Sequence, residues 1–283
     1  MKKIMMTIAA AAMLFAACDK IDADADGRFV SHSGAVAYWE ETTPLADAVQ
    51  RALIEKYTGP RCSNCPNADI ILDNAHGVLN DKLVMVSITP SWGDGEPYEG
   101  QPNMSTADGD QWAMTIGGGE SMALPYGKLN RTTEYKGAPA FTAVQTDAQA
   151  VIADSPKVAM EVTASASGSE VGIDVTVDFR QSVSDELTLT LVLTEDNLQY
   201  MQRWAGHTPA VVEDYSHNHM LRDVITDVWG VDVKAEGSQG EARKAHFNYT
   251  LPDGVVKANC HIVAFVSEKA SRKILNCAES TIE

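Results

Sequence analysis

The apolar residues between positions 48 and 88 follow two different spacings, and these predict three consecutive elements. Residues 48–57 contain a short apolar run that predicts a strand. Residues 83–88 are almost continuously apolar, as in a strand buried on both faces. Between them, apolar residues recur at steps of three and four and predict a helix over residues 66–80: Ala68, Ile71, Leu72, Ala75 and Leu79. Strand, helix and strand in this order predict a parallel crossover unit.

A Cys-x-x-Cys pair lies between the first predicted strand and the predicted helix. Pro66 follows Cys65 directly and suits the first turn of a helix, where its missing N–H costs no hydrogen bond. Backbone N–H groups and the helix dipole at such a position lower the pKa of the first thiol, so Cys62 is the candidate nucleophile and Cys65 the resolving partner. The nearby cations Lys56 and Arg61 also favour a thiolate. This placement predicts a thioredoxin-like unit.

Residues 89–136 read as a long irregular insertion with a short helix over residues 111–116. The segment is rich in Gly, Pro and Asp, and loops of this length usually carry function or hidden helices. Its glycine-rich residues 117–121 lack the Lys-Ser ending of a phosphate loop and predict a turn. Its aromatic residues either form a binding surface for glycans or peptides or pack over the predicted helix: Trp92, Tyr98, Trp112, Tyr126 and Tyr135.

A proline heads the next apolar run, over residues 137–144, which predicts a strand. Thioredoxin-like domains hold a cis-proline beside the cysteine pair at this place. We therefore expect Pro139 to join Cys62 and Cys65 in the catalytic set, provided that the pair is redox-active.

The pattern becomes predominantly strand-like after Pro156. Six short segments rich in Val, Thr and Leu alternate apolar with polar residues: 158–166, 171–180, 186–194, 246–251, 259–267 and 273–277. Such a series predicts a β-sandwich. One helical face interrupts it within residues 196–240: Met220, Leu221, Val224, Ile225 and Val228. The predicted fold class is therefore an α/β thioredoxin-like domain over residues 34–155, with the 89–136 insertion, followed by an all-β sandwich domain over residues 156–283, with a helical insertion at 196–240.

The first residues predict export and a lipid anchor. Residues 1–17 combine two lysines, an apolar run and small residues before Cys18, which resembles a lipoprotein signal peptide whose cleavage leaves Cys18 as the acylated first residue. A plain secretory signal is the alternative. Cleavage removes Lys2 and Lys3 and takes the formal charge from −17 to −19, which disfavours nucleic acid as a partner. Residues 18–33 form an acidic tether with too little apolar content to pack.

Two further groups of residues are candidate sites. Cys260 and Cys277 flank the last predicted hairpin, and they face each other only if its turn is Glu268-Lys269; a turn centred on Ala270-Ser271 separates them. We favour a structural disulfide between them, since exported cysteines usually oxidise. His207, His217 and His219 suggest a metal site only weakly, and helix capping or packing is the preferred role. We expect no metal and no cofactor.

Several stretches together resemble a known family, the outer membrane protein twenty-eight family of Bacteroidetes lipoproteins. The matching residues are 54–59, 62–66, 125–131, 137–139, 215–222 and 262–266. The resemblance implies a thioredoxin-like domain plus a β-sandwich and a lipid-anchored location at the outer membrane, surface-exposed or on its periplasmic face. We expect first a binding or adhesion-type scaffold that meets surface ligands, with Cys62 and Cys65 as a static disulfide. The alternative is a thiol-disulfide oxidoreductase acting on exported proteins.

Overall fold

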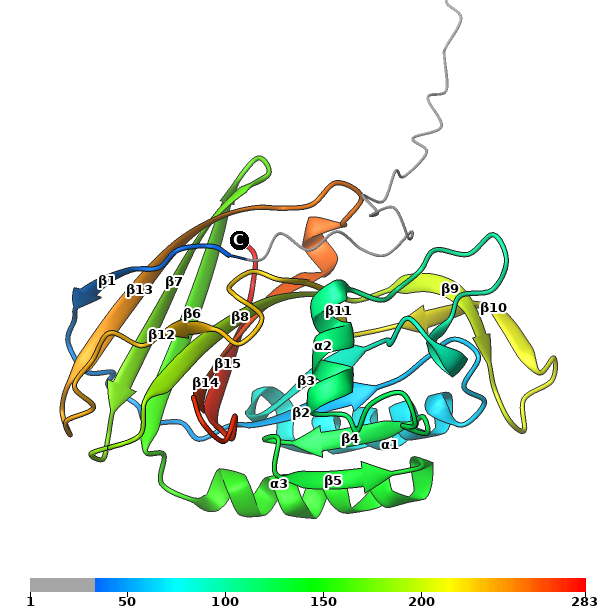
Figure 1. Ribbon diagram of the computed structural model, residues 1–283, viewed down its shortest axis with the longest axis horizontal. Helices are drawn as coiled ribbons and strands as arrows, with labels where there is room; N and C mark the ends of the chain where they lie inside the picture. Colours follow the sequence, from blue (N-terminus) through cyan, green and yellow to red (C-terminus); the bar gives the residue numbers. More distant parts are fainter. Residues whose placement is uncertain (1–33) are drawn as a thin grey trace, which may run out of the picture.

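The structure of the protein is a computed structural model that describes residues 34–283 (Figure 1). The predicted signal peptide, Cys18 and the acidic tether lie outside the described residues. The described chain is a mixed α/β structure in which strands predominate over helices. Across residues 34–283, no helix combines the length and the apolar character that a membrane span requires.

The predicted strand, helix and strand are confirmed as β2 (Ala52–Tyr57), α1 (Cys65–Leu79) and β3 (Leu83–Ile88). The two strands are parallel, with Ala52 opposite Leu83, and every residue of both is buried. Burial on both faces explains their continuous apolar runs. Alternate residues of β2 belong to two apolar core clusters, one on each face of the sheet. Ile54 packs against α1, and Leu53 lies on the opposite face.

The segment predicted as an irregular insertion contains regular elements. Helix α2 (Ala107–Thr115) begins four residues earlier than predicted, because the Oγ1 of Thr106 accepts a hydrogen bond from the N–H of Gly109 at 2.9 Å. A hairpin follows, formed by β4 (Tyr126–Leu129) and β5 (Thr133–Lys136), and β4 pairs antiparallel with β2. The glycine-rich residues 117–121 form a turn after α2.

The strand predicted over residues 137–144 is wrong. Residues Ala138–Ala143 form a 3-10 helix that continues into α3 (Val144–Ala153). The segment from Ala138 to Ala153 is rich in alanine, which favours helix over strand. Helix α3 packs beside α1 on the same apolar cluster, through Val144 and Ala148.

A four-stranded sheet dominates the second half, on the left in Figure 1. Its order is β1-β13-β7-β6, from β1 (Tyr38–Glu41), β13 (Ala242–Thr250), β7 (Glu170–Phe179) and β6 (Val158–Ser167). It shares one apolar core with β8 (Leu187–Glu195), β14 (Cys260–Glu268) and β15 (Ile274–Thr281). All six predicted strands are therefore present, and β1 comes from the N-terminal arm.

One large sheet runs through both halves of the chain. Its order is β15-β14-β8-β11-β3-β2-β4-β5, and the short β12 (Val231–Asp232) pairs with β8 beside β11. Strand β11 (Met220–Val224) joins the halves, because it pairs antiparallel with β8 and parallel with β3 through Met220 and Ser87. The predicted helical insertion at 196–240 is wrong, since residues 198–232 of this stretch form four strands, of which β11 and β12 are the last two. All five residues of β11 are buried, and a strand buried on both faces can show the apolar spacing of a helix.

A separate hairpin connects β8 to β11. Strands β9 (Leu198–Arg203) and β10 (Val211–His217) pair with each other and belong to neither larger sheet. Figure 1 shows this hairpin in yellow, at the end of the molecule farthest from the four-stranded sheet. It lies against the N-terminal end of α1, where the cysteine pair is found.

Candidate functional site

The two cysteines of the pair form a disulfide at the start of α1. The N–H of Cys62 donates to the carbonyl of Gly59 at 3.1 Å, which closes the turn after β2, and Cys65 is the first residue of the helix. The Cα atoms of Cys62 and Cys65 are 5.5 Å apart. Cys62 is 1% exposed and Cys65 is 0% exposed. A thiolate must approach one sulfur directly to exchange with a disulfide, so this pair is closed to partners in the described conformation.

The hairpin β9–β10 seals the disulfide through its main chain and one glutamine. The side-chain amide of Gln202 donates to the carbonyl of Cys62 at 2.9 Å and to that of Gly59 at 3.3 Å. The N–H of Arg203 donates to the carbonyl of Pro60 at 2.8 Å. Gln202 is 1% exposed, so its amide replaces water around the turn. The sequence carries no local signal that links Gln202 to the cysteines.

Three more hydrogen bonds hold the hairpin against the cysteine turn and α1. The N–H of Ala205 donates to the carbonyl of Ser63 at 2.7 Å. The indole N–H of Trp204 donates to Asn67 Oδ1 at 3.1 Å, and the hydroxyl of Tyr215 donates to Asp69 Oδ2 at 2.8 Å. Asn67 and Asp69 lie in the first turns of α1, so the hairpin and the helix carrying Cys65 are joined side by side.

The two cations expected to favour a thiolate have other partners. Lys56 forms an ion pair with Asp69. Arg61 donates to the carbonyl of Pro97 at 2.6 Å, lies 3.4 Å from a carboxylate oxygen of Glu96 and lies over the ring of Tyr98. Arg61 therefore anchors the loop after β3 to the cysteine turn.

The cis-proline next to this site is Pro125, and the position expected at Pro139 is wrong. The cis peptide bonds of the described chain are Leu124–Pro125 and Thr208–Pro209. Pro125 directly precedes β4, whose first residue Tyr126 lies opposite Tyr57 at the end of β2. The cysteine turn also begins at that end of β2. Pro139 instead lies in the first turn of the 3-10 helix.

The three histidines lie in the β9–β10 hairpin or directly after it. His217 ends β10, and His219 precedes β11, so the predicted capping role is wrong because no helix follows them. Burial lowers the pKa of His217 and of His219 to about 4. His207 is exposed and stacks on Trp204 with ring centroids 4.8 Å apart. Within residues 34–283, no group of three or more His, Cys, Asp or Glu side chains is arranged to hold a metal ion.

Three of the five candidate aromatic residues belong to the core. Trp112 is 0% exposed, Tyr135 3% and Tyr126 5%. The indole N–H of Trp112 donates to the carbonyl of Val228 at 2.9 Å, and Tyr135 donates to Asp147 at 2.8 Å. These aromatic rings therefore support packing and cannot form the binding surface that was one of the two expected roles.

Cys260 and Cys277 are free thiols, so the expected disulfide between them is wrong. Cys277 lies opposite Phe265 across the hairpin, and Cys260 lies opposite Glu195 on β8. The register centres the turn close to Ala270-Ser271, which separates the two cysteines. Both are buried, and burial raises the pKa of the Cys260 thiol to about 12.

The core also contains a buried ion pair that no sequence pattern indicates. Arg131 donates to Glu55 Oε1 at 2.9 Å through Nε and at 2.6 Å through Nη2. The Arg131 and Glu55 side chains are 2% and 1% exposed. The guanidinium carbon lies 4.9 Å from the ring centre of Trp112 and 5.0 Å from that of Phe265. The pair thus connects β2, α2 and β14. Apolar patterning cannot reveal a charge in a core.

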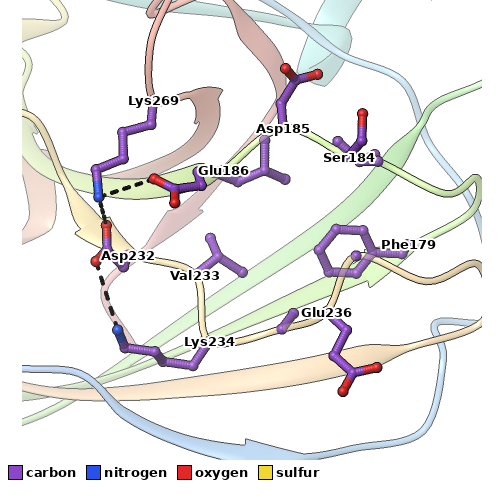
Figure 2. Close-up of a pocket in the computed structure, with 13 residues that line it drawn as sticks. Phe179, Ser184, Asp185, Glu186, Asp232, Val233, Lys234, Glu236 and Lys269 are labelled. Atoms are coloured by element: carbon purple, nitrogen blue, oxygen red, sulfur yellow. Dashed lines mark hydrogen bonds and ion pairs between the residues drawn. The ribbon is translucent and has the colours of Figure 1, made fainter.

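A separate pocket of about 310 Å³ lies at the edge of the four-stranded half (Figure 2). Phe179, Val233 and Leu187 supply apolar lining. Lys269 lies 2.7 Å from Asp232 and 3.6 Å from Glu186, as Figure 2 shows, and its hydrogen bond lowers the pKa of Asp232. The thirteen residues that line the pocket include neither histidine nor cysteine.

These features define a mixed α/β protein with a sealed disulfide at a helix start. The sequence matches the family model of the outer membrane protein Omp28 over residues 119–283, which is more than half of the chain. The chain therefore belongs to the Omp28 family of outer membrane proteins, and the resemblance described above is confirmed. No curated protein matches the sequence.

The chain is also similar to solved structures. HBP35 of Porphyromonas gingivalis has 17% sequence identity and a TM-score of 0.65, and the match covers 84% of this chain and 77% of that chain. A protein of Agrobacterium tumefaciens has 18% identity and a TM-score of 0.47, with 83% and 95% covered. A domain of the outer membrane lipoprotein Omp28 of Porphyromonas gingivalis has 18% identity and a TM-score of 0.31, with 45% and 89% covered. At this identity, HBP35 is informative about the fold alone.

Proposed function

We propose that this protein is a lipid-anchored binding scaffold on the outer membrane, in which the Cys62–Cys65 disulfide crosslinks the turn before α1. The observation that carries the proposal is the burial of both cysteines, at 1% and 0% exposure, in a turn to which the β9–β10 hairpin is hydrogen-bonded. An oxidoreductase that acts on exported proteins needs its reactive sulfur in reach of a partner thiol. The resting conformation does not offer that access.

We further propose the division into a thioredoxin-like unit over residues 34–155 and a β-sandwich over residues 156–283, in which β1 of the first segment completes the four-stranded sheet of the second. The crossover β2-α1-β3, the disulfide at the start of α1 and the cis-proline before β4 support the first unit. The core shared by two facing sheets supports the second. Strand β11 extends the sheet of the first unit into the second.

The test of the scaffold role is a disulfide-exchange assay on the exported chain, with Cys18→Ser to keep it free of lipid. We expect no turnover in insulin reduction and a reduction potential for Cys62–Cys65 below about −300 mV, where structural disulfides lie. Turnover that disappears in Cys62→Ser would show an oxidoreductase and overturn the scaffold role.

The anchor and the surface location are tested in cells. We expect the chain to incorporate labelled fatty acid and to fractionate with the outer membrane, and Cys18→Ser to abolish both. Protease added to intact cells should digest the protein if it faces outward. Protection until the outer membrane is opened would place it on the periplasmic face instead.

A further inference from the structure

The segment over residues 196–219, here called the flap, is connected to the rest of the molecule differently from other strands. It contains β9, β10 and the turn between them, and it leaves the large sheet after β8 and returns at β11. Within the described residues, its two strands form ladder hydrogen bonds only with each other. No sheet therefore has to break for the flap to move.

Both ends of the flap have a backbone suited to a hinge. Asn197 has a φ of 66° and His219 a φ of 57°, so each adopts the left-handed conformation that residues other than glycine rarely adopt. The N–H of Asn197 donates to Asn218 Oδ1 at 2.9 Å, and the N–H of His219 donates to Asp196 Oδ1 at 2.6 Å. These bonds tie the two ends together, so that a rotation at the base moves the hairpin as a unit.

The contacts under the flap are mainly hydrogen bonds, and apolar packing is concentrated at its base. There Leu198 packs with Met104 and Met220. Over the cysteine turn, the flap donates to the carbonyls of Gly59, Pro60, Cys62 and Ser63. Intramolecular hydrogen bonds exchange with bonds to water at a small net cost, whereas apolar burial does not. The part of the flap over the disulfide is therefore the part most easily released.

The N–H donors that the flap directs at the cysteine turn indicate which other ligand could bind there. Two N–H groups point to the cysteine turn from alternate residues: Arg203, the last residue of β9, donates to Pro60, and Ala205, in the turn that follows β9, donates to Ser63. An extended segment can present N–H groups at the same two-residue spacing. Gln202 adds a side-chain amide, and Trp204 adds an aromatic N–H to Asn67. The acceptors are neutral backbone carbonyls and one amide, which need N–H donors and no charge.

We propose that the flap opens locally and that the uncovered cysteine turn docks an extended polypeptide segment of a partner, for which residues 202–205 are the built-in substitute. The inference goes beyond the scaffold role, because a crosslinking disulfide needs no displaceable cover. The partner segment supplies N–H donors at alternate residues, with a glutamine-like amide beside them.

Opening is tested by the rate at which a phosphine reductant cleaves Cys62–Cys65 in the folded Cys18→Ser chain, followed by alkylation and mass spectrometry. Local opening exposes little surface, so we expect the rate to depend on urea much more weakly than global unfolding does. A urea dependence equal to that of global unfolding would mean that the flap never opens on its own, and this would overturn the proposal.

Two variants and one matched control address the hydrogen bonds of the flap. Gln202→Ala should accelerate reduction about tenfold, because the carbonyls of Gly59 and Cys62 each lose one of their two donors. Trp204→Phe keeps a ring, loses the indole N–H and should accelerate reduction about threefold. Gln199→Ala makes the same side-chain change on the exposed face of β9 and should leave the rate unchanged. Equal reduction rates in the parent chain and the three variants, at matched thermal stability, would contradict the proposed opening of the flap.

The docking surface is tested with a fluorescent peptide that copies residues 199–206. We expect it to bind the Gln202→Ala chain more tightly than the chain with Gln202, since the weakened flap competes less. A peptide with alanine in place of its Gln202 equivalent should bind more weakly. Failure of the copied peptide to bind the Gln202→Ala chain would overturn the docking site. The insulin assay decides the scaffold role separately, since it measures turnover and not opening.

Discussion

The buried ion pair between Glu55 and Arg131 gives the sharpest prediction about stability. Replacing Arg131 by Met keeps an unbranched chain between the rings of Trp112 and Phe265 but removes both hydrogen bonds to Glu55. Glu55 Oε2 is itself buried and has no hydrogen-bond partner within residues 34–283. Arg131→Met therefore leaves a carboxylate in the core with neither charge nor donor beside it.

The expected loss is about 3–5 kcal/mol of unfolding free energy, as for other buried pairs from which one partner is removed. Glu55→Met should cost a similar amount because it leaves the guanidinium unpaired. The double variant removes both charges and should be more stable than either single variant. Two methionines also match the apolar surroundings, and replacing a buried pair by apolar residues is often neutral. We therefore expect a coupling energy above about 2 kcal/mol, at the upper end for residues in contact.

The assay is urea unfolding of the two single variants, the double variant and the parent chain, followed by tryptophan fluorescence and circular dichroism. Glu41→Gln serves as control, because Glu41 and Arg243 form an ion pair in which Glu41 is 84% exposed. This control should change stability by less than about 1 kcal/mol. A double variant as unstable as the sum of both single variants would refute the argument, as would an Arg131→Met cost below about 1 kcal/mol.

Four further predictions concern a buried histidine, the two free cysteines and two glycines. Burial lowers the pKa of His217 to about 4, while the pKa of a histidine in an unfolded chain is about 6.5. Between these two pH values the unfolded state binds more protons than the folded state. The contribution of neutral His217 to stability is therefore full above pH ~6.5 and is lost as the pH falls to about 4. Unfolding measured from pH 7.5 to 4.5 should lose stability more steeply in the parent chain than in His217→Asn, and equal slopes would contradict this assignment. Cys260 and Cys277 should resist a thiol reagent in the folded Cys18→Ser chain and react as two thiols in denaturant, whereas a disulfide between them would yield none. Gly59→Ala should destabilise by about 1–3 kcal/mol, since a Cβ there would lie 2.3 Å from the carbonyl oxygen of Asp94. Gly77→Ala in α1 meets nothing within 4 Å and should instead stabilise by up to about 1 kcal/mol.

Local apolar patterns predicted the elements whose burial is simple. Strand β3 and helix α1 were predicted because one is buried on both faces and the other on one. Strand β4 was missed, since it is four residues long and contains Gly127. A Cβ at Gly127 would lie 2.9 Å from the ring of Phe141, so the glycine is needed for the helix after β5 to pack on the strand. That contact is tertiary and leaves no periodic signal.

The same limit applies to the candidate site. Cys62, Cys65 and the helix start could be predicted, because all three are encoded within a few residues. The cover could not, since Gln202 reaches Cys62 across 140 positions of the chain. The apolar run after Pro139 favours a strand, and this pattern predicts the cis-proline at that position. The run is rich in alanine and folds as a helix. The cis-proline is Pro125, which precedes β4, the strand beside β2.

A Cys-x-x-Cys pair at a helix start has an intrinsically reactive first thiol. This reactivity has a consequence only when a partner can reach the sulfur. Here the pair is a buried disulfide at the start of α1, while Lys56 is paired with Asp69 and Arg61 is held by the loop after β3. Access is set by six hydrogen bonds from the flap to the cysteine turn and α1. The free energy of flap opening therefore decides between a permanent crosslink and an exchange site. Gln202→Ala should change that free energy without replacing either cysteine.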